Sequence, residues 1–213
     1  MATENTQRNE RKPDRTRRAI LEAAFQEIYR HGYQGMRLDD VLAATGLTKG
    51  ALYHHFPNKQ ALGYAVVDEI IRGFVHQLWL QPLAESPDPL GRIIEFLGNL
   101  GSVLGGQIVT LGCPMNNLAQ EMSPLDEGFR IRLDAVYQEW RGGIQNALDR
   151  AQRDGIIRAN VDCSHAATFV LAALSGCIGA AKNAQSREQL DICGAGLIDY
   201  LRSLRADGAA LAQ

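Results

Sequence analysis

Residues 38–62 read LDDVLAATGLTKGALYHHFPNKQAL, and this stretch decides the fold of the N-terminal part of the chain. Two short segments with apolar residues at helical spacing lie on either side of Gly46, a residue suited to the left-handed conformation that ends a helix. The hydroxyl of Thr48 can cap the second segment, because it can accept a backbone N–H from the first helical turn. The stretch therefore predicts two short helices, residues 38–45 and 49–56, joined by a tight turn as a helix-turn-helix.

The second of these helices carries side chains that bind phosphate and no groups arranged for catalysis. If Leu52 and Phe56 face the core, helical spacing turns four residues outward together: Lys49, Gly50, Tyr53 and His54. In a helix-turn-helix the second helix enters the major groove of DNA with its N-terminal residues foremost, and its free N–H groups attract phosphate. No nucleophile stands beside an oriented base here. We therefore expect binding to double-stranded DNA.

Helical periodicity dominates the rest of the chain, and no segment alternates convincingly with period two. The expected fold is all-α, with an N-terminal three-helix bundle followed by a C-terminal helical domain. Five glycines between residues 98 and 112 predict short or bent helices there. Ser123 and Pro124 are expected to open a long helix. The other expected helices cover residues 16–31, 59–80, 90–100, 114–122, 162–182 and 186–204.

Composition and charge divide the chain into three parts. With 213 residues, 46% of them hydrophobic and 22% charged, the chain can bury a sizeable core. Residues 1–13 are polar and predict a disordered tail without a secretory signal. Residues 1–59 carry a net charge of about +3 and the remainder about −5, which directs attention to the N-terminal part for nucleic-acid binding. The expected domains are residues 14–60 and 61–213.

The cysteines and the most apolar segment both point to a cytoplasmic protein. Four cysteines, Cys113, Cys163, Cys177 and Cys193, form no C-x-x-C pair, which favours reduced thiols over disulfides or a zinc site. Residues 166–181 are almost free of charge but fall short of the ~20 apolar residues that a membrane span needs. We expect a helix buried by other helices, with no membrane partner, no metal and no cofactor.

A longer stretch, residues 24–62, reads AFQEIYRHGYQGMRLDDVLAATGLTKGALYHHFPNKQAL and resembles the DNA-binding domain of TetR-family bacterial transcriptional regulators. The resemblance covers about residues 16–64. It implies an N-terminal DNA-binding module, a helical effector-binding domain and homodimerisation through the last two helices. It also implies a repressor that a small molecule releases from its operator, with the helix of residues 59–80 transmitting the change. By position, the family's DNA contacts fall on Thr48, Lys49, Gly50, Tyr53, His54 and Lys59.

This chain departs from the family pattern just before the first helix of the motif. Where family members usually carry two hydroxyl residues, it has Met36 and Arg37. The N-cap hydroxyl is therefore missing, and Asp39 and Asp40 are expected to complement the helix dipole instead. Arg37 is a candidate phosphate contact. His55 is expected to point sideways, towards packing or a water-mediated contact.

The effector site is expected among aromatic and sulfur-containing residues of the C-terminal domain. Such sites are mostly hydrophobic with a few polar groups. The candidates are Trp79, Cys113, Met115, Phe129, Tyr137 and Trp140. The alternative for each residue is ordinary core.

Cys113 lies in TLGCPMNNLAQEMS, which resembles a subgroup that includes electrophile-sensing regulators. A thiol near a helix N-terminus would have a lowered pKa and a more reactive thiolate. A thiol-sensing repressor is therefore one alternative, and a packed thiol is the other.

The last two helices carry apolar and small residues suited to a four-helix interface between two chains of a symmetric homodimer. The expected interface residues are Phe169, Val170, Ala173, Leu174, Gly176, Ile178, Leu197 and Leu201. The alternative is a core within one chain.

A helical small-molecule-binding protein or enzyme with a vestigial DNA-binding module is a competing function. Against it stands the scattered placement of acidic and histidine side chains, with Cys163 and His165 standing alone. We therefore expect no enzymatic activity.

Overall fold

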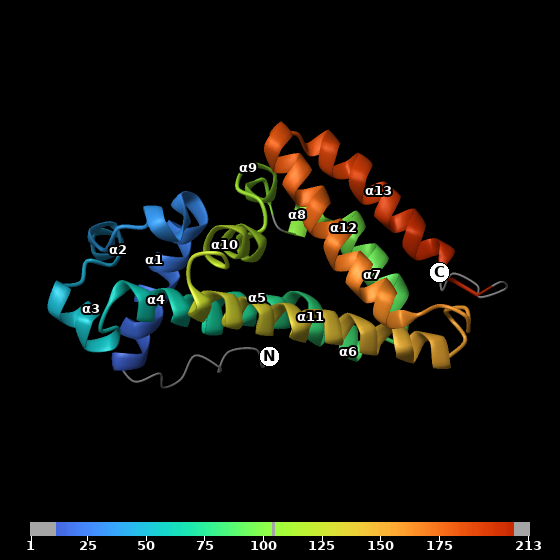
Figure 1. Cartoon of the computed structure of the whole chain (residues 1–213), viewed down its shortest axis with the longest axis horizontal. Helices are drawn as coiled ribbons and strands as arrows, with labels where there is room; N and C mark the ends of the chain where they lie inside the picture. Colours follow the sequence, from blue (N-terminus) through green and yellow to red (C-terminus); the bar gives the residue numbers. More distant parts are fainter. Residues whose placement is uncertain (1–11, 104, 207–213) are drawn as a thin grey trace, which may run out of the picture.

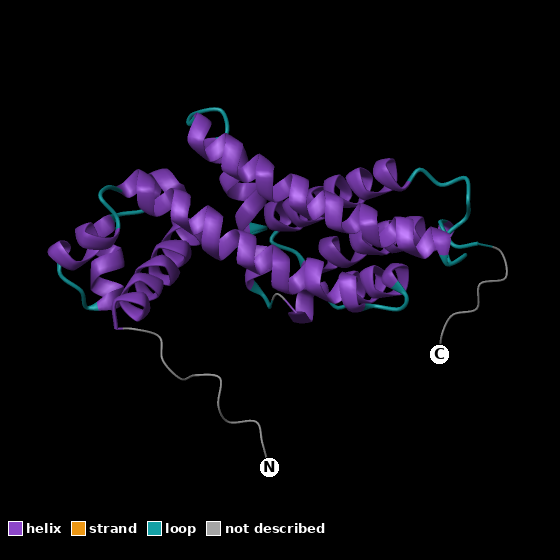
Figure 2. Cartoon of the chain, turned by 90° about the horizontal axis from the view of Figure 1, so that it is seen from below, coloured by secondary structure: helices purple, strands orange, loops and turns teal. Residues whose placement is uncertain are grey.

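A computed structural model of the chain describes residues 12–103 and 105–206 (Figure 1). The described residues form helices and no strand, which confirms the all-α prediction (Figure 2). A single backbone bridge joins Ile157 to Arg205. The N-terminal helices gather at one end of the molecule, and the last two helices lie at the other side (Figure 1).

The first three helices form a unit that we call the head: α1 (Lys12–Gly35), α2 (Leu38–Thr45) and α3 (Lys49–His55). Gly46 adopts φ 66° after α2, as the turn requires, and its N–H donates to the carbonyl of Leu42. The hydroxyl of Thr48 accepts the N–H of Ala51 at 3.3 Å. The helix-turn-helix is therefore confirmed, with its second helix ending one residue earlier than predicted.

Helix α1 is longer than predicted at both ends. It begins at Lys12, so residues 12–13 are helical and do not belong to the expected tail, while residues 1–11 lie outside the described part of the chain. Gly32, the expected stop, has φ 75° and ψ 166°, and interrupts the helix with a kink. One further turn follows, up to Gly35.

A rod of consecutive helical segments leaves the head: α4 (Lys59–Ala65), η1 (Val66–Ile71), α5 (Arg72–Val75), η2 (His76–Leu80) and α6 (Gln81–Glu85). The side chain of Asn58 caps its start by accepting the N–H of Ala61 at 2.7 Å. The segments follow one another without a gap, and the residues at their junctions keep right-handed helical dihedrals. The rod therefore runs past the predicted end at residue 80 and continues through Pro82 into α6.

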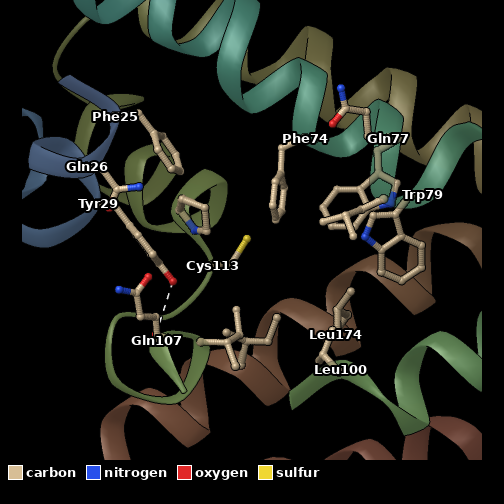
Figure 3. Close-up of a pocket in the computed structure, with 15 residues that line it drawn as sticks. Phe25, Gln26, Tyr29, Phe74, Gln77, Trp79, Leu100, Gln107, Cys113 and Leu174 are labelled. Atoms are coloured by element: carbon tan, nitrogen blue, oxygen red, sulfur yellow. Dashed lines mark hydrogen bonds between the residues drawn. The ribbon is translucent and has the colours of Figure 1, made fainter. Parts of the chain in front are cut away.

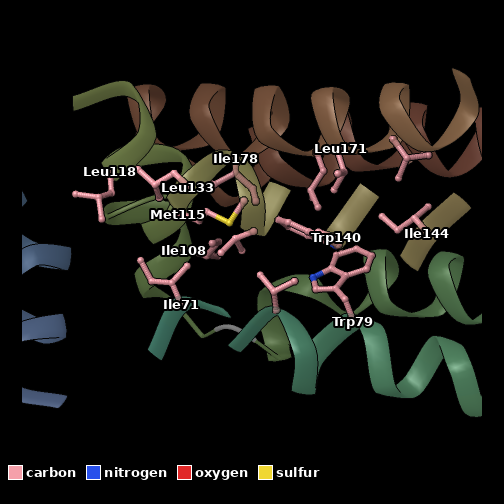
Figure 4. Packing of buried hydrophobic residues seen from close by; sticks show 14 of the residues in the cluster. Ile71, Trp79, Ile108, Met115, Leu118, Leu133, Trp140, Ile144, Leu171 and Ile178 are labelled. Carbon is pink, nitrogen blue, oxygen red and sulfur yellow. The ribbon is translucent and has the colours of Figure 1, made fainter. Parts of the chain in front are cut away.

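The remaining helices complete the body around one continuous core: α7 (Pro89–Gly98), α8 (Leu100–Val103), α9 (Gln107–Thr110), α10 (Pro114–Met122), α11 (Glu127–Arg153), α12 (Cys163–Ala184) and α13 (Arg187–Ser203). The short α8 and α9 match the prediction for the glycine-rich stretch. Apolar residues of α10, α11 and α12 meet the rod in the core (Figure 4). The core thus joins every layer of the body.

The start of α11 was predicted three residues too early. The N–H groups of Leu125 and Asp126 both donate to the carbonyl of Met122, which makes residues 123–126 a turn. Asp126 is the N-cap, and its carboxylate accepts the N–H of Phe129 at 3.0 Å. The same carboxylate also accepts the hydroxyl of Tyr64 at 2.7 Å, a tertiary contact that favours this cap over Ser123.

The prediction of four reduced cysteines is wrong. Cys177 on α12 and Cys193 on α13 form a disulfide, with their Cα atoms 5.3 Å apart. Cys113 and Cys163 are free. The pair is 16 residues apart in sequence, and only the antiparallel packing of α12 against α13 brings the two sulfur atoms together. A search for closely spaced cysteines therefore misses it.

Helix α12 is long and apolar enough to cross a membrane by length and composition alone. It packs against α11 and α13, and 44% of its most apolar window is buried inside the chain. The predicted burial by other helices therefore holds for the inner face of α12 only.

Candidate nucleic-acid interface and internal cavity

Helix α3 divides its residues between the core of the head and the solvent. Leu52 and Phe56 are buried, whereas the side chain of Tyr53 is 49% exposed. The capping residue Thr48 is exposed, and so are the four residues predicted to face outward: Lys49, Gly50, Tyr53 and His54. The short helix thus presents one ammonium group, two hydroxyls and an imidazole on one open face, together with its free N-terminal N–H groups. Such a face can contact phosphates and base edges.

The ammonium of Lys49 lies 3.1 Å from the carboxylate of Asp39 on α2, and both side chains are exposed. An exposed pair of this kind contributes little to stability. Lys49 can therefore exchange this partner for a phosphate at small cost.

The residues that flank α3 differ in accessibility. Arg37 is exposed at the start of α2 and its side chain makes no capping hydrogen bond, which leaves the guanidinium open to solvent. Lys59 is half-buried and donates to the carbonyl of Gln34 at 3.1 Å, above the ring of Tyr33. Burial lowers the pKa of Lys59. Lys59 thus lies in the first turn of α4, at the junction of head and rod, and its contact with the flanking DNA backbone stays a prediction. His55 is half-buried, with its ring 6.4 Å from that of Phe56.

A cavity of about 460 Å³, partly open to solvent, lies between α1, the rod and helices α8 to α12 (Figure 3). Three predicted effector residues line it together: Trp79, Cys113 and Trp140. The side chain of Phe74 and the sulfur of Cys113 point into the same space (Figure 3). A volume of this size is typical of small-molecule sites.

The other three predicted effector residues lie outside this cavity lining. Met115 is buried core. Phe129 packs between the rings of Tyr33 and Tyr64, at centroid distances of 4.6 and 4.9 Å, where the head meets the body. Tyr137 donates its hydroxyl to the side chain of Asn116 at 3.2 Å. Helical spacing placed these residues on the inward stripe of α10 and α11, but it could not show which part of the stripe borders empty space.

Several cavity residues were not predicted. Phe25, Gln26 and Tyr29 come from α1, and Phe74 and Gln77 come from the rod. Helical spacing alone does not distinguish such residues from ordinary core or surface positions. The sequence does contain one feature that indicates a shared aromatic surface on α1. Phe25 and Tyr29 are four positions apart, and residues at this spacing lie on the same face of a helix. Their ring centroids are 5.9 Å apart.

The ionisable groups at the cavity are held neutral. The hydroxyl of Tyr29 donates to the carbonyl of Gly112 at 2.7 Å, and burial raises the pKa of Tyr29 to about 12. Burial also raises the pKa of the Cys113 thiol, although backbone N–H groups of α10 act in the opposite direction. The predicted lowering of this pKa is therefore wrong, because desolvation outweighs the helix N-terminus.

Helix α10 connects the cavity to the head. Cys113 and Pro114 at its start line the cavity, and Glu121 lies near its other end. The carboxylate of Glu121 accepts the backbone N–H groups of Tyr33 at 2.9 Å and Gln34 at 2.8 Å. The absence of a side chain at Gly32 makes this approach possible, because a Cβ atom at residue 32 would lie 2.8 Å from the carboxylate oxygen. One rigid element thus contacts both regions.

The predicted interface residues of α12 and α13 divide between two faces. Five of them are buried within the chain itself, which corrects their assignment to a surface between two chains: Val170, Leu174, Ile178, Leu197 and Leu201. Phe169 is 50% exposed, and Ala173 and Gly176 share its side of α12. Ile192 on α13, which was not in the predicted set, is 62% exposed. The predicted set thus mixed the inner stripe of each helix with its outer one.

Within residues 12–103 and 105–206, no group of three His, Cys, Asp or Glu side chains has the arrangement of a metal site.

Comparisons with known proteins agree on one family. Residues 20–66 match the model of "Bacterial regulatory proteins, tetR family", and residues 89–194 match "Tetracyclin repressor-like, C-terminal domain". The chain is 29% identical to the "HTH-type transcriptional repressor DhaR" of Mycobacterium sp. (strain GP1) over 175 residues, which cover 82% of this chain and 86% of that repressor.

Two further relatives extend this agreement. An "Uncharacterized HTH-type transcriptional regulator in lacX 3'region" of Lactococcus lactis subsp. lactis is 31% identical over 151 residues, which cover 71% of this chain and 76% of the relative. The crystal structure of a TetR-family regulator from Cytophaga hutchinsonii superimposes with a TM-score of 0.83 at 22% identity, over 94% of this chain and 100% of that one, and so shares the fold. Proteins of this kind are regulators and not enzymes, which excludes the enzymatic alternative. The helix-turn-helix, the helical body and these matches together place the chain in the TetR family of bacterial transcriptional regulators.

Proposed function

We propose that the protein is a homodimeric repressor that binds an operator through α3 and is released when a small molecule occupies the internal cavity. The observation that carries this proposal is the joint contact of α10 with the cavity and with the head. Membership of the family supports repression and a location in the cytoplasm or nucleoid.

The DNA side of the proposal rests on the open face of α3. Lys49 serves as a phosphate or guanine contact, and Tyr53 and His54 donate to phosphate oxygens. Gly50 has no side chain, so the backbone can approach the duplex closely at this exposed position. Arg37 extends the surface to the first helix of the motif.

The dimer in the proposal uses the outer face of α12 and α13. Exposed Phe169 and Ile192 supply apolar area, and Gly176 has open space around its Cα. Small residues of this kind allow a second pair of helices to approach closely. A two-fold arrangement is what an operator with two half-sites one helical turn apart requires.

The release step is a population shift between two arrangements of the heads. A ligand that displaces the start of α10 moves Glu121, and with it the end of α1. The rod, which begins at Lys59 beside the head and passes the cavity at Trp79, provides a second route.

Covalent sensing through Cys113 has less support. The raised pKa keeps the thiol protonated at neutral pH, whereas the thiolate is the reactive form.

The test is binding of the purified protein to the duplex upstream of its own gene, compared with a scrambled duplex at two salt concentrations. Lys49→Ala and Tyr53→Ala are measured alongside Arg153→Ala, an exposed cation at the far end of α11. We expect a preference of ~10³ or more for the native duplex, weakened by the two α3 variants and unchanged by the control. Equal binding of both duplexes with the same steep salt slope would show phosphate attraction alone and contradict operator recognition.

A further inference from the structure

The exposed ion pair between α2 and α3 lies on the surface through which the head is proposed to bind DNA. We infer that Asp39 is a positioning residue that determines sequence specificity: it holds the ammonium of Lys49 for a guanine edge and keeps it from the phosphates. This inference rests on the proposed operator binding through α3. It adds which part of the duplex Lys49 contacts and which residue decides this.

The pair joins the N-terminal ends of the two helices of the motif. Asp39 lies in the first turn of α2, and Lys49 is the first residue of α3. Oδ1 of Asp39 lies 3.1 Å from Nζ of Lys49, and the two side chains are 65% and 70% exposed. In a helix-turn-helix the N-terminal residues of the second helix reach the base edges. A duplex that contacts Lys49 therefore also comes close to Asp39.

The carboxylate of Asp39 changes which contacts favour the ammonium of Lys49. The pair has no net charge, so it lacks most of the long-range attraction that draws a lone lysine to phosphate. The ammonium has three N–H donors, and the single carboxylate oxygen at 3.1 Å occupies one of them. The other donors are available to a guanine, whose O6 and N7 are adjacent acceptors in the major groove. The pair therefore favours a base contact.

Transfer of Lys49 from Asp39 to a phosphate costs little in water but is unfavourable on the duplex. In the free chain the exposed pair is weak. On the duplex, the transfer would leave the carboxylate unpaired beside the phosphates, at a surface that has lost part of its water. Like charges placed together in an interface are strongly unfavourable. A guanine contact avoids this repulsion, because Lys49 keeps its partner.

Arg37 provides a comparison on the same surface. It is exposed directly before α2, and its guanidinium has no ion-pair partner within residues 12–103 and 105–206. Its charge is therefore free to attract a phosphate, and phosphate contacts position the head without reading sequence. The two cations should act differently, Arg37 on the DNA backbone and Lys49 on a base.

The test starts with selection of duplexes from a randomised pool by the full chain, which finds the preferred sequence wherever the operator lies. Affinities for the selected duplex and for a scrambled one are then measured at several salt concentrations. We expect Lys49→Ala to lower the preference for the selected duplex by about 10-fold and to leave the salt slope unchanged. Arg37→Ala should weaken both duplexes alike and make the slope shallower by about 0.9 per head.

Variants of Asp39 test its effect on Lys49. Asp39→Asn keeps the size of the side chain and releases the ammonium. We expect it to bind the scrambled duplex about 10-fold more tightly at ~0.1 M salt, with a slope steeper by about 0.9 per head and a weaker preference at the guanine. Asp39→Glu keeps the charge and should retain the wild-type slope. In the Lys49→Ala background, Asp39→Asn should no longer steepen the slope.

Asp40→Asn is the matched control. It removes a carboxylate from the same turn of α2, but Asp40 forms no ion pair with Lys49. The preference for the selected duplex and the salt slope should therefore stay at their wild-type values. Circular dichroism verifies that each variant is folded.

Three results would overturn the inference and leave operator binding intact. If Lys49→Ala weakens both duplexes equally and flattens the slope, Lys49 is a phosphate contact. If Asp39→Asn and Asp40→Asn have equal effects, only the general charge of α2 matters. If Asp39→Asn loses preference at a base pair that Lys49→Ala leaves unaffected, Asp39 reads that base directly. Selection that enriches no sequence with the folded wild type would overturn the proposed operator binding together with this inference.

Discussion

Glu121 accepts the backbone N–H of Tyr33 at 2.9 Å, and so joins the C-terminal half of α10 to the last turn of α1. The neighbouring N–H of Gln34 reaches the other carboxylate oxygen at 2.8 Å. One carboxylate thereby accepts two backbone N–H groups directly after the kink at Gly32. The contact crosses the boundary between head and body.

Removing the contact between Glu121 and the end of α1 should destabilise the junction between head and body. We expect Glu121→Ala to lower the free energy of unfolding by about 2 kcal/mol, because two hydrogen bonds to a charged group are lost in a half-exposed setting. Operator affinity should fall as well. Chemical denaturation and duplex titration measure the two effects, with Gln120→Ala, an exposed neighbour, as the control. A Glu121→Ala variant as stable as the control would show that the contact is dispensable.

The rod, the head and α11 meet at Gly63. A Cβ atom there would lie 2.6 Å from the ring of Tyr33 and 2.7 Å from that of Phe129. We expect Gly63→Ala to destabilise the chain by about 1–3 kcal/mol through overpacking. Gly142→Ala on α11, where a Cβ meets nothing within 4 Å, should instead stabilise by roughly 0.5–1 kcal/mol. Thermal unfolding of the two variants separates steric from helix-propensity effects, and a shift of the same sign in both would contradict the crowding.

The carboxylate of Asp126 should make the free energy of unfolding depend on pH in the acidic range. Its hydrogen bond from Tyr64, and a second from Gln60, lower the pKa of Asp126 below the ordinary 3.8. Because the pKa of Asp126 is lower in the folded state, its ionised carboxylate stabilises the fold. This contribution is fully present above about pH 3.8 and is lost as the pH falls through the pKa of the folded state. The pKa of Tyr64 is raised by the same bond, so its contribution is complete below about 10 and is lost at higher pH.

Tyr64→Phe removes the shared hydrogen bond and tests both arms of this profile. We expect the unfolding free energy of the variant to change less than that of the wild type, both between pH 4 and 3 and above about pH 10. Identical pH profiles for the two proteins would rule out the coupling.

The disulfide between Cys177 and Cys193 should contribute measurably to stability. It closes a loop with a sequence separation of 16 residues, for which about 3 kcal/mol is typical. Dithiothreitol should therefore lower the unfolding free energy of the wild type by this order. The double variant Cys177→Ala, Cys193→Ala provides the control, because the reductant should leave it unchanged. Equal unfolding of the wild type with and without reductant would mean that the bridge adds nothing.

Local signals in the sequence predicted the head well. The helix boundaries there depend on contacts between close neighbours in sequence. Gly46 ends α2 by its left-handed conformation, and Thr48 and Asn58 each cap the following helix by accepting an N–H three residues on. Such local features suffice to place α2, α3 and the start of the rod. The start of α11 was wrong because the choice of Asp126 depends on Tyr64, which is 62 residues away.

The cavity and the outer faces could be predicted only in part. Apolar periodicity identified Trp79, Trp140 and Phe129 as inward residues, but only the packing of several helices decides which of them border a void. The same limit applies to α12, where periodicity grouped buried Val170 with exposed Phe169. The Cys177–Cys193 pairing lies beyond such patterns, because it depends on the register of two helices.

The placement of Trp79 and Trp140 has a practical consequence. The chain contains two tryptophans, and both line the same cavity. Its intrinsic indole emission therefore originates wholly from the walls of the candidate effector site, without background from the DNA-binding head. An unlabelled sample can thus report occupancy of the cavity optically, compound by compound, before any operator is known.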